Sequence, residues 1–315
     1  MNTQVLLAPM SGFSDLAFRL ISRECGAKFC YLEMLSANTL MYNSPGNRHL
    51  MTTIDKDTPL AAQLVGSDPS IIFDAALKVL DRVPIDYIEL NSACPVKKVI
   101  KKKGGAYLLH DTGLLEKILL KMCKSLPVPV TVKLRIGFRK IDPKETARIA
   151  KICEAAGVAR IFMHGRTASQ HYMGDVDYAS LRAAKEAVKV PFFASGNILS
   201  PVLAKKMVDQ TGCDGILVAR GALGNPWIFS EIEDYLTCGV LPEKKRALSE
   251  KKKMLKRHLS YIERYKETGP ANLRGFMGKV TMWYLKGIPD AAKLRNRICK
   301  TKSIPELYRL IYSVA

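Results

Sequence analysis

Short runs of apolar, β-prone residues recur along most of the chain. Successive runs begin 24 to 43 residues apart, which leaves room for a loop and a helix between them. The runs are hydrophobic almost throughout instead of alternating, as expected of parallel strands that are buried on both faces. They cover residues 5–10, 29–34, 60–66, 87–94, 130–137, 160–166, 191–197 and 215–221. Eight such strands predict an α/β fold, a closed (β/α)8 TIM barrel.

Helix-start signals stand between the runs. Pro69, Pro143 and Pro201 each follow an Asp or a Ser, which places a capping side chain just before a proline at the first helical position. An open, doubly wound sheet has the same local pattern, so closure into a barrel rests on the count of eight strands.

After about residue 236 the strand rhythm stops and only helical patterns remain. These patterns cover residues 242–266, 270–286, 290–299 and 304–312. The change predicts two domains, a catalytic barrel over residues 1–235 and a small all-α domain over residues 236–315.

Positive charge is concentrated in the second of these regions. The chain has 49 Lys and Arg against 29 Asp and Glu, a net charge of +20, and residues 236–315 alone contribute +13. An excess of this size favours a polyanionic partner, either nucleic acid or an anionic membrane. No run approaches 18 consecutive apolar residues, and the first residues lack the features of a signal peptide. We therefore expect a cytoplasmic protein without membrane contacts.

Eight cysteines are scattered along the chain without a CxxC pair and without histidines at metal-binding spacing. This pattern predicts free thiols and no metal site. Cys94 differs from the others because it ends a predicted strand, and reactive groups of a TIM barrel lie at the C-terminal ends of its strands. Pro95 stiffens the turn. Since cysteine thiols are mostly protonated at neutral pH, Cys94 can act as a general acid. A lone cysteine is more often a small hydrophobic core residue, but Cys94 is the only one of the eight that is predicted at the reactive strand ends, which favours a functional role.

Other strand ends carry groups suited to a phosphate-bearing cofactor. Gly196 and Gly221 follow the last two strands, the usual phosphate site of such barrels, and His164 and Arg220 also end strands. Tight turns alone would also explain the glycines.

Two polar residues interrupt the apolar strands. Burying Lys133 is costly unless its ammonium meets an acceptor or an anion. If the cofactor is a flavin, the anionic pyrimidine ring of its reduced form would serve. The alternative is a salt bridge to Glu89 or Glu33. Gln63 suits the edge of a planar heterocycle, or it hydrogen-bonds its neighbours.

Two basic segments are candidates for nucleic-acid binding. Lys97 and Lys98 begin a lysine-rich run soon after Cys94. The run lies at the rim of the predicted mouth, the opening of the barrel at the C-terminal ends of its strands. Trp283 and Tyr284 lie among basic residues in the helical region 236–315, called the tail below. They either pack helices together or stack on bases, and packing is the favoured role for Trp283. The cations expected to contact phosphates there are Arg274, Lys279, Lys286, Lys293, Arg295 and Arg297.

Together these motifs resemble those of the dihydrouridine synthase family, flavin enzymes that reduce uridine in transfer RNA. The resemblance extends over nearly the whole chain. It is carried by residues 8–15 (APMSGFSD), 18–19, 63–66 (QLVG), 89–95 (ELNSACP), 98–99, 132–137 (VKLRIG), 164–167 (HGRT) and 219–227 (ARGALGNPW).

The resemblance implies an FMN-binding barrel followed by a helical domain that binds tRNA, with NADPH as the reductant. It implies that Cys94 is the proton donor and that Asn91 and Arg166 lie near the uracil or flavin ring. No DNA and no obligate protein partner are expected. The residues implied to bind FMN are Pro9, Met10, Ser11, Gln63, Lys133, His164, Ser195, Gly196, Asn197, Ala219 and Arg220.

Two other functions stay open from the sequence. An FMN barrel that reduces a free pyrimidine or another small electrophile would have no evident use for the basic tail. An RNA-binding protein built on a degenerate barrel would bind no flavin.

Overall fold

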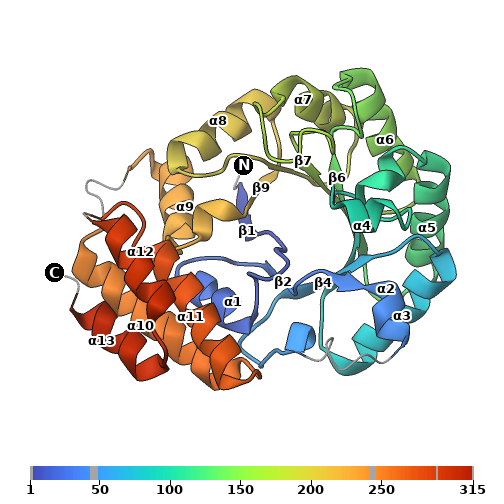
Figure 1. Cartoon of the computed structure of the whole chain (residues 1–315). Helices are drawn as coiled ribbons and strands as arrows, with labels where there is room; N and C mark the ends of the chain where they lie inside the picture. Colours follow the sequence, from blue (N-terminus) through green and yellow to red (C-terminus); the bar gives the residue numbers. More distant parts are fainter. Residues whose placement is uncertain (1–2, 43–48, 242–245, 289, 314–315) are drawn as a thin grey trace.

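A computed structural model describes residues 3–42, 49–241, 246–288 and 290–313. Parallel strands form a nearly closed barrel with helices around it, as predicted (Figure 1). The strands are β1 (Gln4–Leu7), β2 (Cys30–Tyr31), β3 (Leu35–Ser36), β4 (Leu60–Val65), β5 (Tyr87–Asn91), β6 (Val130–Arg135), β7 (Arg160–His164), β8 (Phe192–Ser195) and β9 (Gly215–Val218).

The helices of the barrel region lie between successive strands or follow the last one. They are α1 (Leu16–Glu24), α2 (Ala37–Met41), α3 (Pro69–Arg82), α4 (Lys97–Ile100), α5 (Thr112–Ser125), α6 (Pro143–Ala155), α7 (Tyr178–Ala187), α8 (Pro201–Thr211) and α9 (Ile228–Cys238). The short 3-10 helices are η2 (His49–Met51), η3 (Gly105–Leu109) and η4 (Arg220–Ala222). The remaining helices are α10 (Leu248–Tyr265), α11 (Pro270–Tyr284), α12 (Ala291–Lys300) and α13 (Ile304–Tyr312).

The strand order around the barrel is β1-β9-β8-β7-β6-β5-β4-β2. The ends of this series meet where the Leu7 N–H donates to the Phe29 carbonyl at 3.1 Å, just before β2. The second predicted strand is shorter than the pattern over residues 29–34 indicated. Only Cys30–Tyr31 pairs there as β2, and β3 pairs separately with β4, because the register changes by one residue: residues 32–34 separate Tyr31 from Leu35, whereas only residues 62–63 separate their partners Ala61 and Leu64.

Three predicted helix starts are confirmed. Pro69, Pro143 and Pro201 open α3, α6 and α8, and the Asp or Ser side chain before each accepts backbone N–H groups of the first turn. The predicted helix over residues 242–266 begins at Leu248 in the structure, and residues 242–245 lie outside the described part of the chain.

The barrel interior has an apolar lower layer and a polar upper layer. Aromatic rings fill the lower part, where Phe162 contacts Phe193 at 4.9 Å and Tyr31 at 5.9 Å between ring centroids. Nearer the strand ends, buried Gln63 and Glu89 point inward from β4 and β5. The aromatic layer closes the barrel from below, so the reactive groups meet at its upper mouth.

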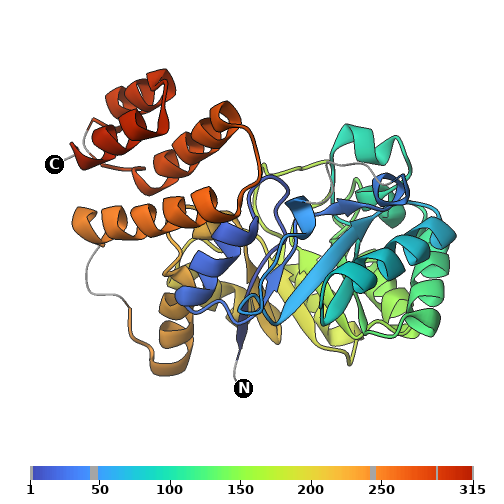
Figure 2. The ribbon, with the colours of Figure 1, turned by 90° about the horizontal axis from the view of Figure 1, so that it is seen from below.

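Helices α10 to α13 share a hydrophobic core of their own, to which α1 contributes Ala17. They stand beside the barrel, toward the end opposite the N-terminus in the side view (Figures 1 and 2). Salt bridges join them to α1 and its cap, from Arg257 to Glu24 at 2.5 Å and from Lys266 to Asp15 at 2.9 Å. The boundary after residue 235 falls within α9 and stays a prediction.

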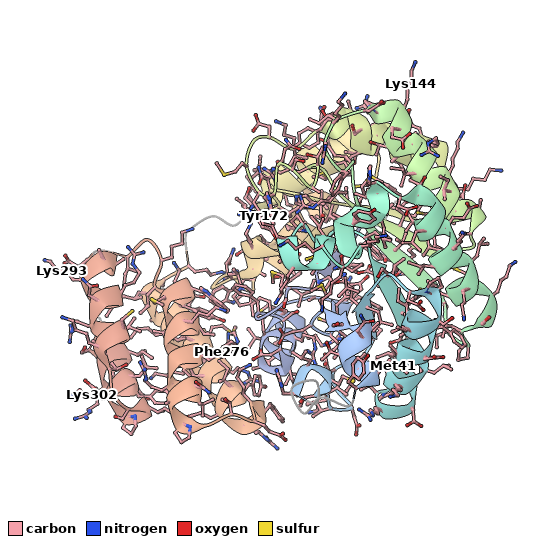
Figure 3. All side chains as sticks on the ribbon, turned by 45° about the vertical axis from the view of Figure 1, so that its right-hand side comes forward. Met41, Lys144, Tyr172, Phe276, Lys293 and Lys302 are labelled. Atoms are coloured by element: carbon pink, nitrogen blue, oxygen red, sulfur yellow. The ribbon has the colours of Figure 1, made fainter. Side chains whose placement is uncertain are left out.

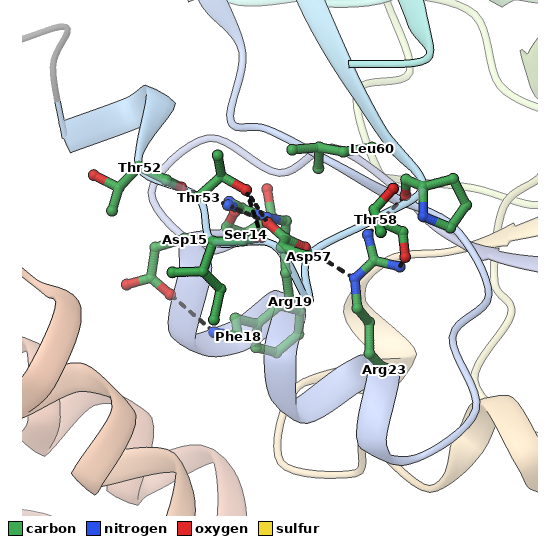
Figure 4. Close-up of polar contacts among 12 residues, drawn as sticks. Ser14, Asp15, Phe18, Arg19, Arg23, Thr52, Thr53, Asp57, Thr58 and Leu60 are labelled. Atoms are coloured by element: carbon green, nitrogen blue, oxygen red, sulfur yellow. Dashed lines mark hydrogen bonds and ion pairs between the residues drawn. The ribbon is translucent and has the colours of Figure 1, made fainter. Parts of the chain in front are cut away.

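A buried ion pair holds α1 against the segment that leads into β4 (Figure 4). Asp57 accepts the Nε groups of Arg19 at 2.8 Å and Arg23 at 2.9 Å. Arg19 also donates through Nη1 to the Ser14 carbonyl at 2.8 Å. The network therefore fixes the loop between β1 and α1, which lies at the mouth.

Candidate active site

A tight turn after β5 carries Cys94, whose side chain is half-buried. The side-chain oxygen of Asn91, the last residue of β5, accepts the backbone N–H groups of Ala93 at 3.0 Å and Cys94 at 2.9 Å. The Cys94 carbonyl accepts the Ala106 N–H at 3.0 Å. A Cβ at Gly105, where φ is +59°, would come within 2.8 Å of that carbonyl oxygen, so glycine is required there. The thiol is thus carried by a turn that is held on both sides.

Arg135, the last residue of β6, joins the Cys94 turn to the loop after β7. Its Nε donates to the Ala93 carbonyl at 2.8 Å, and its Nη1 donates to the carbonyls of Thr167 and His171 at 2.9 and 2.8 Å. The side chain is buried. Arg135 has no role predicted from the sequence, although it ends a strand within the motif 132–137.

Arg166 closes the loop after β7 onto the loop after β8. Its Nη2 donates to the Gly174 carbonyl at 2.7 Å and to Asn197 Oδ1 at 3.0 Å. Its buried Nη1 has no hydrogen-bond partner among the described residues. Two loops expected at the site are therefore joined, with one guanidinium donor group left unused.

His164, at the end of β7, is held neutral. Burial lowers its pKa well below the usual value, and nearby cations lower it further. Its Nδ1 lies 3.3 Å from Ser195 Oγ, whereas its buried Nε2 has no partner within the part of the chain that is described. The cations that act on it are Lys133, Arg135, Arg166 and Arg220. This concentration of positive charge beside unmet polar atoms is typical of an anion-binding site.

Inside the mouth a buried carboxylate, Glu89, lies near Lys133. Burial raises the pKa of Glu89 and lowers that of Lys133, while the attraction between the two charges opposes both shifts. Lys133 forms no direct ion pair with any described residue, so the alternative of a salt bridge to Glu89 or Glu33 is not seen. Glu89 instead accepts a hydrogen bond from Gln63 at 2.5 Å.

The loop between β1 and α1 is fixed both by the barrel and by helix α11. The Gly12 N–H donates to the Glu33 carboxylate, and the Gly12 carbonyl accepts Lys279 Nζ of α11 at 2.9 Å. The Lys279 ammonium also lies 3.8 Å from the centroid of the Phe13 ring, which stacks on Trp283. Burial raises the pKa of Glu33. The tail therefore reaches the mouth itself, and Trp283 serves in packing.

The other basic residues expected to bind substrate lie farther out. Lys97 and Lys98 are exposed on α4, and Arg274 of α11 is half-buried. Lys286, Arg295 and Arg297 are exposed, as is Lys293, which pairs with Asp290 at 3.1 Å. Figure 3 shows Lys293 and Lys302 pointing outward from the tail helices.

The remaining residues expected to bind the cofactor lie at the same ends of neighbouring strands. Pro9, Met10 and Ser11 follow β1, Ser195 ends β8 and is followed by Gly196 and Asn197, and Ala219 and Arg220 follow β9. Because β1, β9 and β8 are adjacent in the barrel, these three strand ends form one side of the mouth.

A comparison with protein-family models finds a match over residues 6–308 to the family described as dihydrouridine synthase (Dus). The chain belongs to this family. Within the family it is similar to tRNA-dihydrouridine synthase B of Pseudomonas aeruginosa, with 36% identity over 95% of this chain and 89% of that protein. It is 34% identical to tRNA-dihydrouridine synthase B of Escherichia coli K12, over 91% of this chain and 88% of that protein.

Solved structures support the fold of this family member. The barrel is similar to part of histamine dehydrogenase from Rhizobium sp. 4-9, with a TM-score of 0.56 and 12% sequence identity over 73% of this chain and 45% of that one. At this identity the likeness concerns the fold alone.

The donor set of this dihydrouridine synthase family member fits an anionic, planar cofactor such as FMN. Buried His164 Nε2 and Arg166 Nη1 are unpartnered among the described residues, and cations converge around them. Tyr172, another residue without a predicted role, lies between Arg135 and Arg220, with its ring centroid 5.6 and 5.2 Å from the two guanidiniums. No sequence motif distinguished Tyr172 from other loop residues.

The described residues offer no candidate for a membrane-spanning helix or for a metal-binding cluster. No helix among them is long and apolar enough to cross a membrane. No group of three or more His, Cys, Asp or Glu side chains among them is arranged to hold a metal ion.

Proposed function

We propose that this chain reduces uridine in transfer RNA to 5,6-dihydrouridine, with FMN as cofactor and NADPH as reductant, in the cytoplasm. The observation that carries the proposal is the convergence of the Cys94 turn and the cationic cluster around His164 at one barrel mouth. The names of the relatives support the substrate, since both are tRNA-dihydrouridine synthases that match over nearly the whole chain.

The strand ends of the mouth would hold FMN. Gly196, Asn197 and Arg220 would bind its phosphate, while Gln63 and Lys133 would face its ring system. The complete proposed set is Pro9, Met10, Ser11, Gln63, Lys133, His164, Ser195, Gly196, Asn197, Ala219 and Arg220. When bound and reduced by NADPH, FMN supplies a hydride to carbon 6 of the uracil ring.

Cys94 supplies the proton. As the hydride arrives, the S–H bond breaks and a C–H bond forms at carbon 5, which saturates the ring and leaves a thiolate. Asn91 and Arg135 hold the turn that carries the thiol, from opposite sides. Asn91 and Arg166 are also the proposed neighbours of the uracil or flavin ring.

The basic surfaces would hold the RNA while the target uridine leaves its stack to enter the mouth. In this proposal the catalytic barrel spans residues 1–235 and the RNA-binding helical domain spans residues 236–315. Lys97 and Lys98 would contact RNA at the rim. In the helical domain the proposed contacts are Arg274, Lys279, Lys286, Lys293, Arg295 and Arg297.

The test is a nucleoside count by mass spectrometry on transfer RNA that lacks dihydrouridine, after incubation with the purified protein and NADPH. We expect a gain of about two mass units on uridine, the mass of the added hydride and proton. Bound flavin and NADPH consumption without that gain would reject the RNA substrate and favour a free pyrimidine or another small electrophile. If the protein binds RNA but no flavin, the proposed flavin-dependent reaction is contradicted.

A further inference from the structure

We propose that Glu89 is a positioning residue that orients the Cys94 turn without touching it. Its effect passes through two buried amide side chains, Gln63 and Asn91. These four residues form a chain of hydrogen bonds that runs from a carboxylate in the barrel interior to the backbone N–H of the reactive cysteine. The inference rests on the proposed function only for the chemical role of Cys94.

The strands bring the members of this chain together. Gln63 of β4 and Glu89 of β5 are direct neighbours in the register of the sheet, and Asn91 lies two residues beyond Glu89 on the same inward face. Gln63 is 2%, Glu89 0% and Asn91 6% exposed, so these groups are shielded from bulk water and rely on one another as hydrogen-bond partners. Each amide must therefore satisfy its neighbours with the correct end.

At the cysteine end of this series of hydrogen bonds, only one orientation of the Asn91 amide is possible. Two backbone donors, the N–H groups of Ala93 and Cys94, face Asn91, which must present Oδ1 to both. Its NH2 group is then directed at Gln63 and donates to Oε1 at 2.7 Å.

The carboxylate end sets the same direction independently when Glu89 is ionised. Burial raises the pKa of Glu89 to about 7, and above that pH the ionised carboxylate can only accept a hydrogen bond. Gln63 then turns its NH2 group toward Glu89, and the donor–acceptor distance is 2.5 Å. Gln63 Oε1 is then left to accept from Asn91. Without an acceptor at position 89, both amides could reverse, and Asn91 would direct NH2 at the Cys94 N–H, where donor faces donor.

Glu89 also carries a charge near Lys133, so an experiment must separate hydrogen-bond direction from charge. Glu89→Gln removes the charge but can still present an oxygen to Gln63. Glu89→Leu removes the charge and the acceptor together. Gln63→Met breaks the series of hydrogen bonds at its centre and leaves the charges of Glu89 and Lys133 in place.

Two readouts on flavin-bound protein require neither RNA nor NADPH. The first is the backbone amide resonance of Cys94 in protein labelled with 15N-cysteine, assigned by its loss in Cys94→Ala. The second is the rate of Cys94 alkylation by iodoacetamide between pH 6 and 9, followed by mass spectrometry. Flavin content and thermal denaturation are measured for each variant to verify folding.

We expect Glu89→Leu and Gln63→Met to move the Cys94 amide resonance and to change its alkylation rate by at least about threefold. Glu89→Gln should keep both close to the parent values. Parent-like behaviour of folded Glu89→Leu overturns the proposal. If Glu89→Leu fails to fold, parent-like Gln63→Met overturns it equally. Equal effects of Glu89→Gln and Glu89→Leu overturn it as well, since charge alone would then be responsible.

Discussion

The barrel mouth and the helical tail hold their charged side chains in opposite ways. At the mouth, buried Arg135 donates to three backbone carbonyls, so its position is set by the fold. In the tail, Arg295 and Arg297 end in solvent, and Lys293 makes only an exposed pair with Asp290. Chemistry requires one geometry, whereas binding a polyanion requires charge spread over a surface. A single substitution should therefore have a large effect on activity at the mouth, whereas each substitution in the tail should weaken RNA binding only slightly.

The largest effect is expected at Cys94. Cys94→Ala removes the proposed proton donor, and we expect uridine reduction to fall by about 100-fold or more. The measurement is single-turnover formation of dihydrouridine in RNA. Reduction of the bound flavin by NADPH serves as the control and should be unaffected. Turnover at the parent rate on RNA would remove Cys94 from its proposed role.

Helix α1 makes a buried ion pair with the segment before β4 and an exposed ion pair with α10, and the two pairs should differ in the same sense. Asp57→Ala leaves the buried guanidinium of Arg19 without its carboxylate, and we expect a loss of about 3–5 kcal/mol in the free energy of unfolding. Arg257→Ala breaks the exposed pair with Glu24 and should cost less than about 1 kcal/mol.

Urea denaturation measures both. Similar losses for the two variants would show that burial does not govern the strength of these pairs.

The mouth and the tail also differ in how far the sequence predicts them. The barrel was predictable because its strands are buried on both faces and its helices start with Asp or Ser before Pro, which are local signals. The position of Cys94 at the mouth followed from strand ends alone. Arg135 lacked a prediction because its partners Thr167 and His171 lie over 30 residues away in the chain.

Lys279 shows the limit in the tail. Its sequence context is that of an exposed cation on a basic helix, but the structure places its ammonium on the Gly12 carbonyl and over Phe13. That contact depends on how α11 docks on the barrel, a long-range arrangement that no local pattern encodes. The division of β2 from β3 likewise depends on the register with β4, a strand that comes later in the chain.

The tail's own core makes a pH-dependent contribution through His258. Burial against α1 and α11 lowers its pKa to about 4, and its Nδ1 lies 3.1 Å from the Tyr284 hydroxyl. The unfolded chain takes up this proton near pH 6.5, but the folded chain takes it up only near pH 4. The stability is therefore complete above pH 6.5 and is lost as the pH falls toward 4.

We expect His258 to account for about 2 kcal/mol of the stability lost between pH 7 and pH 5. His258→Gln keeps a polar partner for Tyr284 and should remove that part of the pH dependence. The measurement is urea unfolding at both pH values. An unchanged difference between pH 7 and pH 5 would show that His258 is not the group that titrates.

The smallest change per residue is expected on the tail surface. Replacing Lys293, Arg295 and Arg297 together with glutamine should weaken tRNA binding and reduce the slope of log affinity against log salt by about 1 to 2. The slope should fall by less than three full phosphate contacts would give, because Asp290 already neutralises part of Lys293. Flavin content should not change.

The matched control removes the same charge elsewhere. Lys124, Lys144 and Lys151 are exposed on α5 and α6, and Figure 3 shows Lys144 on the side of the barrel away from the tail. Their replacement with glutamine should leave the salt slope nearly at the parent value. If the two triple variants lower affinity and slope equally, the RNA responds to net charge alone, and the tail is not a specific binding surface. A difference between them assigns the released counterions to α12, because the two variants share net charge and differ only in where the charge was removed.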